Sequence, residues 1–321
     1  MLIVTEDVCR QVIGRDDAFK AVEAVFAAMA RGEAYNFPVI REAIGYADAL
    51  YGFKSGFDRA GLSLGLKSGG YWPGNIKKGL TNHQSTIFLF DPDTGQLKAL
   101  VGGNYLTAVR TAASSSVSIA HLARKDARVI GMIGAGHQST FQLRAAAEQR
   151  QFEKVVAWNF HEGMLGNLEK TANEIGLPFE AVEREQLGAQ ADVIITITSA
   201  HEPQLMKEWV KPGTHIACMG TDTKGKQEID PALVAASTVF TDEIEQSITI
   251  GETQHALAAG LISGCDITTL GAVINKDHPG RSSDDEITLF DGTGVGLQDL
   301  AVASTAARLA EEQGKAQIVE L

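Results

Sequence analysis

The side chains of this sequence that could do chemistry include three cations, a histidine and an aspartate, at Arg41, Lys67, Arg110, His83 and Asp222. Reduction of a carbonyl or imine needs a cation that fixes the substrate carboxylate and a group that transfers a proton. A guanidinium binds a carboxylate through two parallel hydrogen bonds, and a lysine on an apolar strand has a lowered pKa that suits proton transfer. These residue types therefore permit reduction of a carbonyl or imine group in a substrate that also carries a carboxylate, provided that a hydride donor is bound.

Each of these residues also has an ordinary structural explanation. Cations form salt bridges, lysine side chains extend from strands to solvent, and polar side chains cap loops. The structural alternatives are a solvent-directed Lys67, an interdomain salt bridge for Arg110, a pair with Glu42 for Arg41, a loop cap at Asp222 and a hydrogen-bonded structural His83. The sequence alone leaves both kinds of role open.

The hydride donor is indicated by a glycine loop between an apolar run and an alanine-rich stretch. Residues 129–133 are typical of a buried strand, and Gly134-Ala135-Gly136 leads directly into a helical pattern. The first glycine permits a tight turn, the second lets the backbone approach a pyrophosphate, and the helix N-terminus offers unpaired amides. Ser139 stands where a third glycine is usual, and it is still small. We expect a nicotinamide dinucleotide at Gly134 and Gly136, although such glycines also occur in plain turns.

The end of the next strand bears on which dinucleotide is bound. An acidic residue about 20 residues beyond the loop normally binds the ribose hydroxyls, and Asn159 occupies that place here. No lysine or arginine stands beside it to pair with a 2′-phosphate, so we expect NAD(H). NADP stays the alternative, because an amide does not repel a phosphate and His161 could assist. We also expect His137 and Ser199 to contact the cofactor.

The chain of 321 residues predicts two domains. A helical pattern over residues 17–30 is followed, between 38 and 101, by short apolar runs separated by Gly, Asp and Pro, including a hairpin signal at 85–95. We therefore expect a sheet-rich first domain over residues 1–115 and a second over residues 116–299, with 300–321 returning to the first. The fold class is α/β: a Rossmann-type doubly wound parallel sheet plus a smaller α+β domain.

The second domain is predicted from short apolar runs that alternate with helical stretches. The expected strands are 129–133, 154–158, 192–198, 215–219, 239–241 and 286–290, and the expected helices are 138–150, 164–175, 231–236 and 296–312. A further helix is expected to start near Thr107.

Composition excludes several classes of protein. No apolar run approaches the roughly 20 residues that span a bilayer, and a net charge of −12 repels nucleic acid. Without a basic segment before an apolar stretch, the N-terminus does not resemble a signal peptide, so we expect a soluble cytoplasmic protein with no membrane partner. Cys9, Cys218 and Cys265 form no metal-type pair, and we expect three reduced packing residues and no metal.

Four ordered stretches resemble the ornithine cyclodeaminase/μ-crystallin family over nearly the whole chain. They are Gly65-Leu66-Lys67 with Pro73 and Asn75, Arg110 to Ala113, Gly134 to Gln138, and Gly220-Thr221-Asp222 with Glu228 and Asp230; the ending Asp291 to Gly294 with Gln298 to Ala301 is also similar. The resemblance implies a homodimer with a Rossmann domain and a first domain that binds substrate and dimerises, completed by the C-terminal helix.

The resemblance also implies roles for individual residues. Lys67 and Asp222 match residues of the reacting centre, and Arg41 and Arg110 match those that hold the substrate carboxylate. The residues matching Thr111 and Gln138 contact the cofactor, and His83 is a candidate for the substrate pocket.

The family exchanges hydride at the α-carbon of amino or imino acids. The runs 34–41, 51–56 and 69–75 are most similar to members that reduce iminosuccinate to L-aspartate with NADH. Asp222 would then steady the iminium charge and Lys67 would assist proton transfer, with the proton donor left open between them. A dicarboxylate needs two anion sites, and Lys54, Ser55 or His83 could add donors to the three cations.

Other activities remain as alternatives. They are an ornithine cyclodeaminase, an alanine dehydrogenase or ketimine reductase, and a non-catalytic crystallin-type nucleotide-binding protein. An ornithine pocket needs a carboxylate for the distal amine, and Asp48 and Asp58 flank the 51–57 run.

Overall fold

The computed structural model describes residues 1–320, which form two compact units. Unit 1 comprises Met1–Arg110 and the chain from Val295 onward, and unit 2 comprises Thr111–Gly294. Each boundary lies a few residues before the one that the sequence predicted. Among residues 1–320, no helix is both long enough and apolar enough to cross a membrane.

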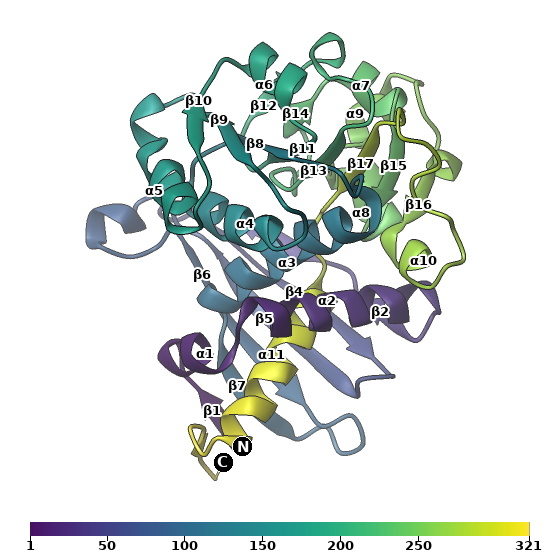
Figure 1. The fold of residues 1–321 in the computed structure, drawn as a ribbon. Coiled ribbons are helices and arrows are strands. Elements are labelled where there is room, and N and C mark those ends of the chain that lie inside the picture. The colour runs from purple at the N-terminus through teal and green to yellow at the C-terminus, as the bar shows by residue number, and fades with distance from the viewer. Residues whose placement is uncertain (321) are drawn as a thin grey trace. The chain divides into compact units, whose positions relative to one another are not determined.

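Unit 1 is built on a mixed sheet whose strands run in the order β18-β1-β7-β6-β5-β4-β2, with β3 paired to β4 (Figure 1). The strands are β1 (Leu2–Val4), β2 (Ala34–Asn36), β3 (Ile40–Ala43), β4 (Leu50–Asp58), β5 (Ser63–Tyr71), β6 (His83–Phe90), β7 (Leu97–Gly102) and β18 (Gln317–Ile318). The helices are α1 (Glu6–Val12), α2 (Arg15–Ala30), the 3-10 turn η1 (Asn75–Lys78), the first turns of α3 (Asn104–Leu122), and α11 (Gly296–Glu312).

Two helices from opposite ends of the chain cover one face of this sheet. The apolar stripe of α2, with Val22, Val25 and Phe26 buried, packs beside α11, which also contacts β4, β5 and β6 (Figure 1). The helical period of that stripe is what the sequence pattern predicted. By returning to unit 1, α11 brings residues near position 300 against strands that begin near position 50.

Unit 2 contains a parallel sheet in the order β10-β9-β8-β11-β13-β17-β15-β16. Its strands are β8 (Val129–Ile133), β9 (Lys154–Trp158), β10 (Phe179–Ala181), β11 (Val193–Thr196), β13 (His215–Cys218), β15 (Thr238–Thr241), β16 (Ile267–Thr269) and β17 (Thr288–Asp291), and β12 (His201–Leu205) pairs separately with β14 (Gln227–Ile229). The near-continuous apolar character of these strands fits a sheet buried on both faces.

Helices lie on both sides of the unit 2 sheet, with α4 and α5 on one side and α6 and α7 on the other (Figure 1). The helices are α4 (His137–Ala147), α5 (Gly166–Glu174), α6 (Arg184–Gln190), α7 (Pro231–Ala235), α8 (Ile244–Ile250), α9 (Gln254–Ala258) and α10 (Leu270–Ile274), with 3-10 turns η2 (Glu162–Met164), η3 (Lys207–Trp209) and η4 (Gly264–Asp266). The strand order reverses between β8 and β11, and ligands of doubly wound folds bind at such a switch point.

Two local expectations were wrong. The helix predicted to start near Thr107 begins at Asn104, whose side-chain oxygen accepts a hydrogen bond from the Ser85 amide. Arg110 therefore lies well inside this helix. Cys9 and Cys218 are buried, but Cys265 is exposed and does not pack in a core; all three thiols are free.

Candidate active site

The centre of unit 1 is a buried cluster of two cations on one carboxylate. Lys67 on β5 places its Nζ 2.6 Å from Oδ2 of Asp299 on α11, and Arg110 on α3 places its Nε 3.0 Å from Oδ1 of the same carboxylate. Arg110 also donates to the side-chain oxygen of Gln298 at 2.9 Å. Lys67 and Arg110 are each 6% exposed and Asp299 is 0% exposed.

This geometry decides between the explanations that the sequence left open. Lys67 does not extend to solvent, and the carboxylate that Arg110 binds lies in the same unit, so that contact is not an interdomain bridge. The Nζ of Lys67 also lies 3.5 Å from the hydroxyl of Thr107. Two cations held by one carboxylate keep donors available for an anionic ligand.

Electrostatics adjust the protonation of the cluster. Burial lowers the pKa of Lys67 to about 7; the charge of Asp299 opposes this shift, and the charges of Arg110 and Lys54 add to it. Burial alone would raise the pKa of Asp299, but Arg110 and Lys67 outweigh it and hold that pKa below its usual value. A lysine whose pKa lies near neutrality can both donate and accept a proton at physiological pH.

Two further predicted residues lie on the same face of the unit 1 sheet. Lys54 on β4 pairs directly with Lys67 on β5, and Arg41 on β3 pairs with Gly52 two positions before Lys54. Directly paired antiparallel residues project to one face, so Arg41 and Lys54 share the face of Lys67. Arg41 is exposed, and Lys54 is half-buried.

His83 begins β6 and belongs to the electrostatic environment of this cluster. Burial, with the charges of Lys67 and Arg110, lowers its pKa to about 3. The imidazole is therefore neutral at physiological pH. A neutral imidazole can donate or accept one hydrogen bond without adding charge.

In unit 2 the glycine loop has the geometry that a pyrophosphate requires. Gly134 has φ +106°, and a Cβ there would lie 2.5 Å from the carbonyl oxygen of Ile197. Gly136 caps α4, and within the described residues no atom lies within 4 Å of the place that its Cβ would take. The first position thus needs glycine for the turn, and the second leaves open space at a helix N-terminus.

A cavity of about 520 Å³ opens beside this loop, lined by residues that include Gly136, Trp158, Asn159, His161 and Ser199. Its lining, within residues 1–320, contains one carboxylate, that of Glu202, and neither lysine nor arginine. An adenosine without a 2′-phosphate suits such a lining, because no strong cation is present to neutralise the phosphate.

Asn159 has a structural task besides the one that the sequence suggested. Its side-chain oxygen accepts the amide of Ala135 at 2.9 Å, and its side-chain nitrogen donates to the carbonyl of His161 at 2.8 Å. Asn159 therefore ties the glycine loop to the end of β9. Binding of the ribose by Asn159 stays a prediction.

The remaining predicted cofactor contacts lie around α3 and α4. The side-chain oxygen of Gln138 is buried without a hydrogen-bond partner within the described chain, which leaves it available to a ligand donor such as a ribose hydroxyl. Thr111 is buried in α3, whereas His137 is exposed and its ring lies 5.4 Å from that of Phe141. The orphaned oxygen and the open glycine together fit a bound dinucleotide.

Asp222 follows β13 and has a partner that the sequence analysis missed. Lys226 places its Nζ 2.8 Å from Oδ1 of Asp222, and the hydroxyl of Thr223 donates to the same oxygen at 3.1 Å. The Asp222 side chain is 36% exposed. A carboxylate bound to one cation can still accept hydrogen bonds from a ligand, since it has several lone pairs.

Buried acids hold the loop that carries Asp222. Glu228 accepts a hydrogen bond of 2.9 Å from the Gly220 amide. Glu252 accepts hydrogen bonds from the Thr221 hydroxyl at 2.5 Å and from the Ile229 amide at 2.7 Å. Burial and the charge of Glu228 raise the pKa of Glu252 to about 8. Among residues 1–320, no group of three or more His, Cys, Asp or Glu side chains is arranged to hold a metal ion.

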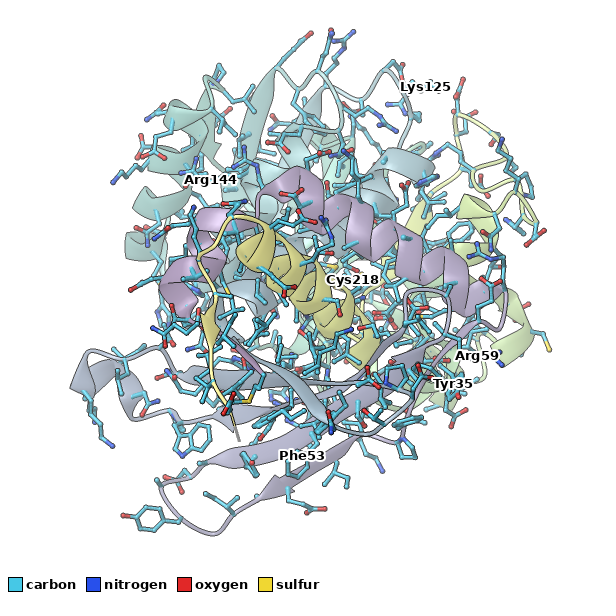
Figure 2. The ribbon with its side chains drawn as sticks, turned by 90° about the horizontal axis from the view of Figure 1, so that it is seen from below. Tyr35, Phe53, Arg59, Lys125, Arg144 and Cys218 are labelled. Carbon is cyan, nitrogen blue, oxygen red and sulfur yellow. The ribbon has the colours of Figure 1, made fainter. Side chains whose placement is uncertain are left out.

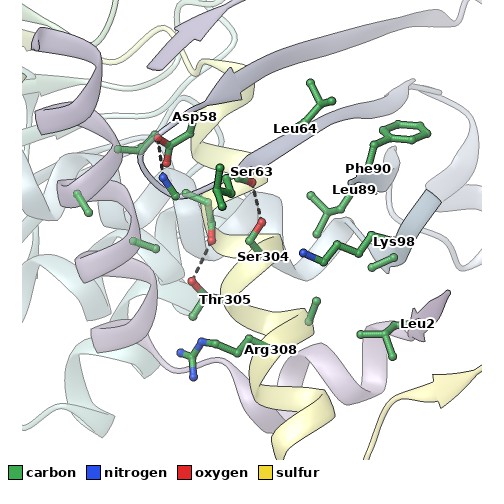
Figure 3. Close-up of a pocket in the computed structure, with 18 of the residues that line it drawn as sticks. Leu2, Asp58, Ser63, Leu64, Leu89, Phe90, Lys98, Ser304, Thr305 and Arg308 are labelled. Carbon is green, nitrogen blue, oxygen red and sulfur yellow. Dashed lines mark hydrogen bonds between the residues drawn. The ribbon is translucent and has the colours of Figure 1, made fainter. Parts of the chain in front are cut away.

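A separate cavity of about 470 Å³ lies in unit 1 between α2, α11 and the strands (Figure 3). Lys98 and Arg308 are among its lining residues, as are Ser63 and Ser304, whose hydroxyls share a hydrogen bond of 2.6 Å. None of the predicted site residues lines this cavity. It is therefore distinct from the Lys67 cluster.

Asp299 and Gln298 belong to the buried cluster, but the sequence analysis assigned no role to either residue. The contact between Arg110 and Asp299 joins residues 189 positions apart, which no local pattern can indicate. The available signal was the Gln298-Asp299 pair in the last segment of the family resemblance, to which no role was assigned.

Comparison with known proteins agrees with this architecture. The model of the "Ornithine cyclodeaminase/mu-crystallin family" matches residues 1–313. An iminosuccinate reductase from Paracoccus denitrificans is 64% identical over 321 residues, which is all of both chains. The crystal structure of the Paracoccus denitrificans iminosuccinate reductase in complex with NAD⁺ has a TM-score of 0.97 and 64% identity, over 100% of this chain and 99% of that one.

A second solved structure, an archaeal alanine dehydrogenase dimer with bound NAD, has a TM-score of 0.94 and 32% identity, over 100% of this chain and 99% of that one. The family match spans both units, and the glycine loop, Lys67, Arg110 and Asp222 lie within it. The chain belongs to the ornithine cyclodeaminase/μ-crystallin family.

Proposed function

We propose that this protein is an NADH-dependent imine reductase that reduces iminosuccinate to L-aspartate. The observation that carries the proposal is the charge of the unit 1 cluster. Lys67, Arg110 and Lys54 surround one carboxylate, Asp299, so three positive groups and one negative group leave a net charge of +2 when all are ionised. The two carboxylates of iminosuccinate match that charge.

The cluster favours a dicarboxylate over ornithine. The distal ammonium of ornithine needs a carboxylate of its own, and Asp299 already binds two cations. The other two charged groups with a large effect on the pKa of Lys67, Arg110 and Lys54, are both cations. The 64% identity to an iminosuccinate reductase supports the same choice.

Each residue of the cluster has a defined task in this proposal. Arg110 binds one substrate carboxylate, with its guanidinium already oriented by Asp299 and Gln298. Lys67, as an ammonium, donates a proton to the imine nitrogen, and the neutral imidazole of His83 offers a further hydrogen bond. We assign the second substrate carboxylate to Arg41 and Lys54.

Unit 2 is assigned to the cofactor. Gly134 and Gly136 would hold the pyrophosphate, and Gln138, Thr111, His137, Asn159 and Ser199 are the proposed additional contacts. Bound NADH supplies the hydride that the imine carbon receives. Asp222 offers a carboxylate to the iminium charge, and Lys226 holds that carboxylate in place.

We propose that the protein is a homodimer that joins through unit 1. The sheet face opposite α2 and α11 carries apolar side chains in directly paired rows, because Phe57 pairs with Leu64 and Leu66 pairs with Phe88. These four side chains are half-buried, and Phe53 on the same strand face is 37% exposed (Figure 2). A second copy would cover this face, and the archaeal alanine dehydrogenase of the same fold is a dimer.

The cytoplasm is the proposed location. The three cysteines are free, which suits a reducing compartment.

The proposal is tested by following NADH at 340 nm with oxaloacetate and ammonium, which form iminosuccinate in solution. We expect NADH oxidation that requires ammonium, yields L-aspartate and is much slower with pyruvate and ammonium. Oxidation that does not depend on ammonium would indicate a keto-acid reductase instead. Ammonia release from ornithine without net NADH change would indicate a cyclodeaminase.

A further inference from the structure

We propose that Asp299 is a positioning residue for imine reduction: its carboxylate fixes Lys67 and Arg110 in the arrangement that the substrate meets. The inference rests on the proposed function for its kinetic consequences. The geometry that supports it lies within unit 1. Asp299 acts through two other residues and is not assigned a contact with substrate.

Each oxygen of Asp299 serves one cation. Oδ2 lies 2.6 Å from the Lys67 ammonium, and Oδ1 lies 3.0 Å from Nε of Arg110. Gln298, the preceding residue of α11, binds NH1 of the same guanidinium. One carboxylate thereby sets the separation of the proposed proton donor and the proposed carboxylate clamp, which belong to different elements, β5 and α3.

The helix that carries Asp299 favours an ionised carboxylate there. Asp299 lies in the first turn of α11, where the helix dipole stabilises negative charge. Its side chain is fully buried, and a buried carboxylate without a cation would be strongly unfavourable. Asp299, Lys67 and Arg110 therefore stabilise one another's charged forms, and removal of the carboxylate would leave adjacent cations without a counter-charge.

This coupling gives Asp299 a signature that a purely structural role lacks. Without the carboxylate, Arg110 and Lys54 repel the Lys67 ammonium with no compensation, so Lys67 loses its proton at lower pH. An opposite charge within ion-pair distance changes a pKa by about 1–3 pH units. Asp299→Asn keeps the shape of the side chain and an oxygen for Arg110, while it removes the charge.

The experiment measures kcat/KM for imine reduction from pH 5.5 to 9 for the wild type, Asp299→Asn, Asp299→Glu and Gln298→Ala. For Asp299→Asn we expect the loss of activity at high pH to begin about 1–3 pH units lower than in the wild type. The fall in kcat/KM between pH 5.5 and pH 8 should therefore be about tenfold larger in this variant than in the wild type. Gln298→Ala is the matched control, since it removes a neutral partner of Arg110. It should raise KM and leave the pH profile unchanged.

Asp299→Glu keeps the charge and displaces it, so its pH profile should resemble the wild type while KM rises about tenfold or more. An unchanged profile in Asp299→Asn would overturn the proposal. If that variant does not fold, a wild-type KM in Asp299→Glu would overturn it as well.

A measurement without substrate separates this inference from the proposed function. Acetic anhydride labels neutral amines, and peptide mass spectrometry reports the pH at which Lys67 becomes half-reactive. That pH should be lower in Asp299→Asn than in the wild type. If the wild type fails to reduce iminosuccinate, the proposed function is wrong, while equal labelling profiles would refute the role of Asp299.

Discussion

Alanine substitutions at the two glycines of the loop should affect different properties: Gly134→Ala should lower stability, and Gly136→Ala should weaken NADH binding. At Gly134 a Cβ would lie 2.5 Å from the Ile197 carbonyl oxygen, and the φ of +106° is unfavourable for any L side chain. The backbone strain costs about 1–2 kcal/mol and the overpacking about 1–3 kcal/mol. Gly134→Ala should therefore lower the thermal midpoint of the apo protein by at least about 4 °C, at about 2–4 °C per kcal/mol.

Gly136→Ala should leave the apo protein almost as stable as the wild type. Its φ is −74°, which alanine adopts freely, and no described atom lies within 4 Å of the new methyl group. Loss of glycine at a helix N-cap costs at most about 1 kcal/mol. The methyl group would instead occupy the space assigned to the pyrophosphate, and loss of one amide-to-phosphate hydrogen bond is worth about 1.5–3 kcal/mol. The Kd for NADH should rise about 10- to 100-fold.

The assay combines thermal unfolding of the apo proteins with fluorescence titration of NADH at one temperature. Unchanged NADH affinity in Gly136→Ala, with the fold intact, would refute the assignment of the pyrophosphate to this loop. A large loss of stability in Gly136→Ala would show that the space beside it is not open.

Lys67→Met should lower kcat/KM about 10²- to 10⁴-fold, because the proton donor is lost. Lys98→Met, which replaces an exposed lysine on β7 of the same sheet, should retain wild-type turnover, and equal rates in the two variants would refute the role of Lys67. In the wild type, burial lowers the Lys67 pKa to about 7, so the ammonium is present below that pH. The value of kcat/KM for imine reduction should therefore fall about tenfold per pH unit above pH 7. Activity that rises above pH 7 would indicate that Lys67 acts as a base. Leu66→Glu should convert the dimer to monomer in light scattering, while Leu261→Glu, at a half-exposed position of unit 2, should not. His161→Arg should tighten NADPH binding about tenfold by pairing with the 2′-phosphate, and an unchanged NADPH Kd would place the phosphate elsewhere.

The parallel sheet of unit 2 could be predicted because its signals are local. Strands β8 and β9 occupy the predicted residues 129–133 and 154–158, since apolar runs of that length are typical of buried parallel strands. The glycine loop was equally visible, because a turn with positive φ at Gly134 must be encoded by the residue at the turn. Helix α11 was predicted over its observed range from helical periodicity.

The charge partners could not be predicted, because they depend on the tertiary fold. Lys67 and Arg110 were identified as candidate cations, but their shared counter-ion is supplied by a helix that returns from the other end of the chain. The predicted domain boundary at residue 299 separated Asp299 from the unit to which it belongs. Asn159 was assigned to the ribose from its position alone, and only the structure shows that it ties the loop to β9.

In the proposed reaction, hydride from NADH reaches the imine carbon of a dicarboxylate substrate. The most direct measurement uses NADH deuterated at both C4 positions, with oxaloacetate and ammonium in ordinary water, and analyses the product by mass spectrometry and NMR. We predict L-aspartate with one deuterium at Cα for each NADH consumed. NADH oxidation that leaves the aspartate free of deuterium, or that yields deuterated malate instead, would rule out hydride transfer to the imine carbon.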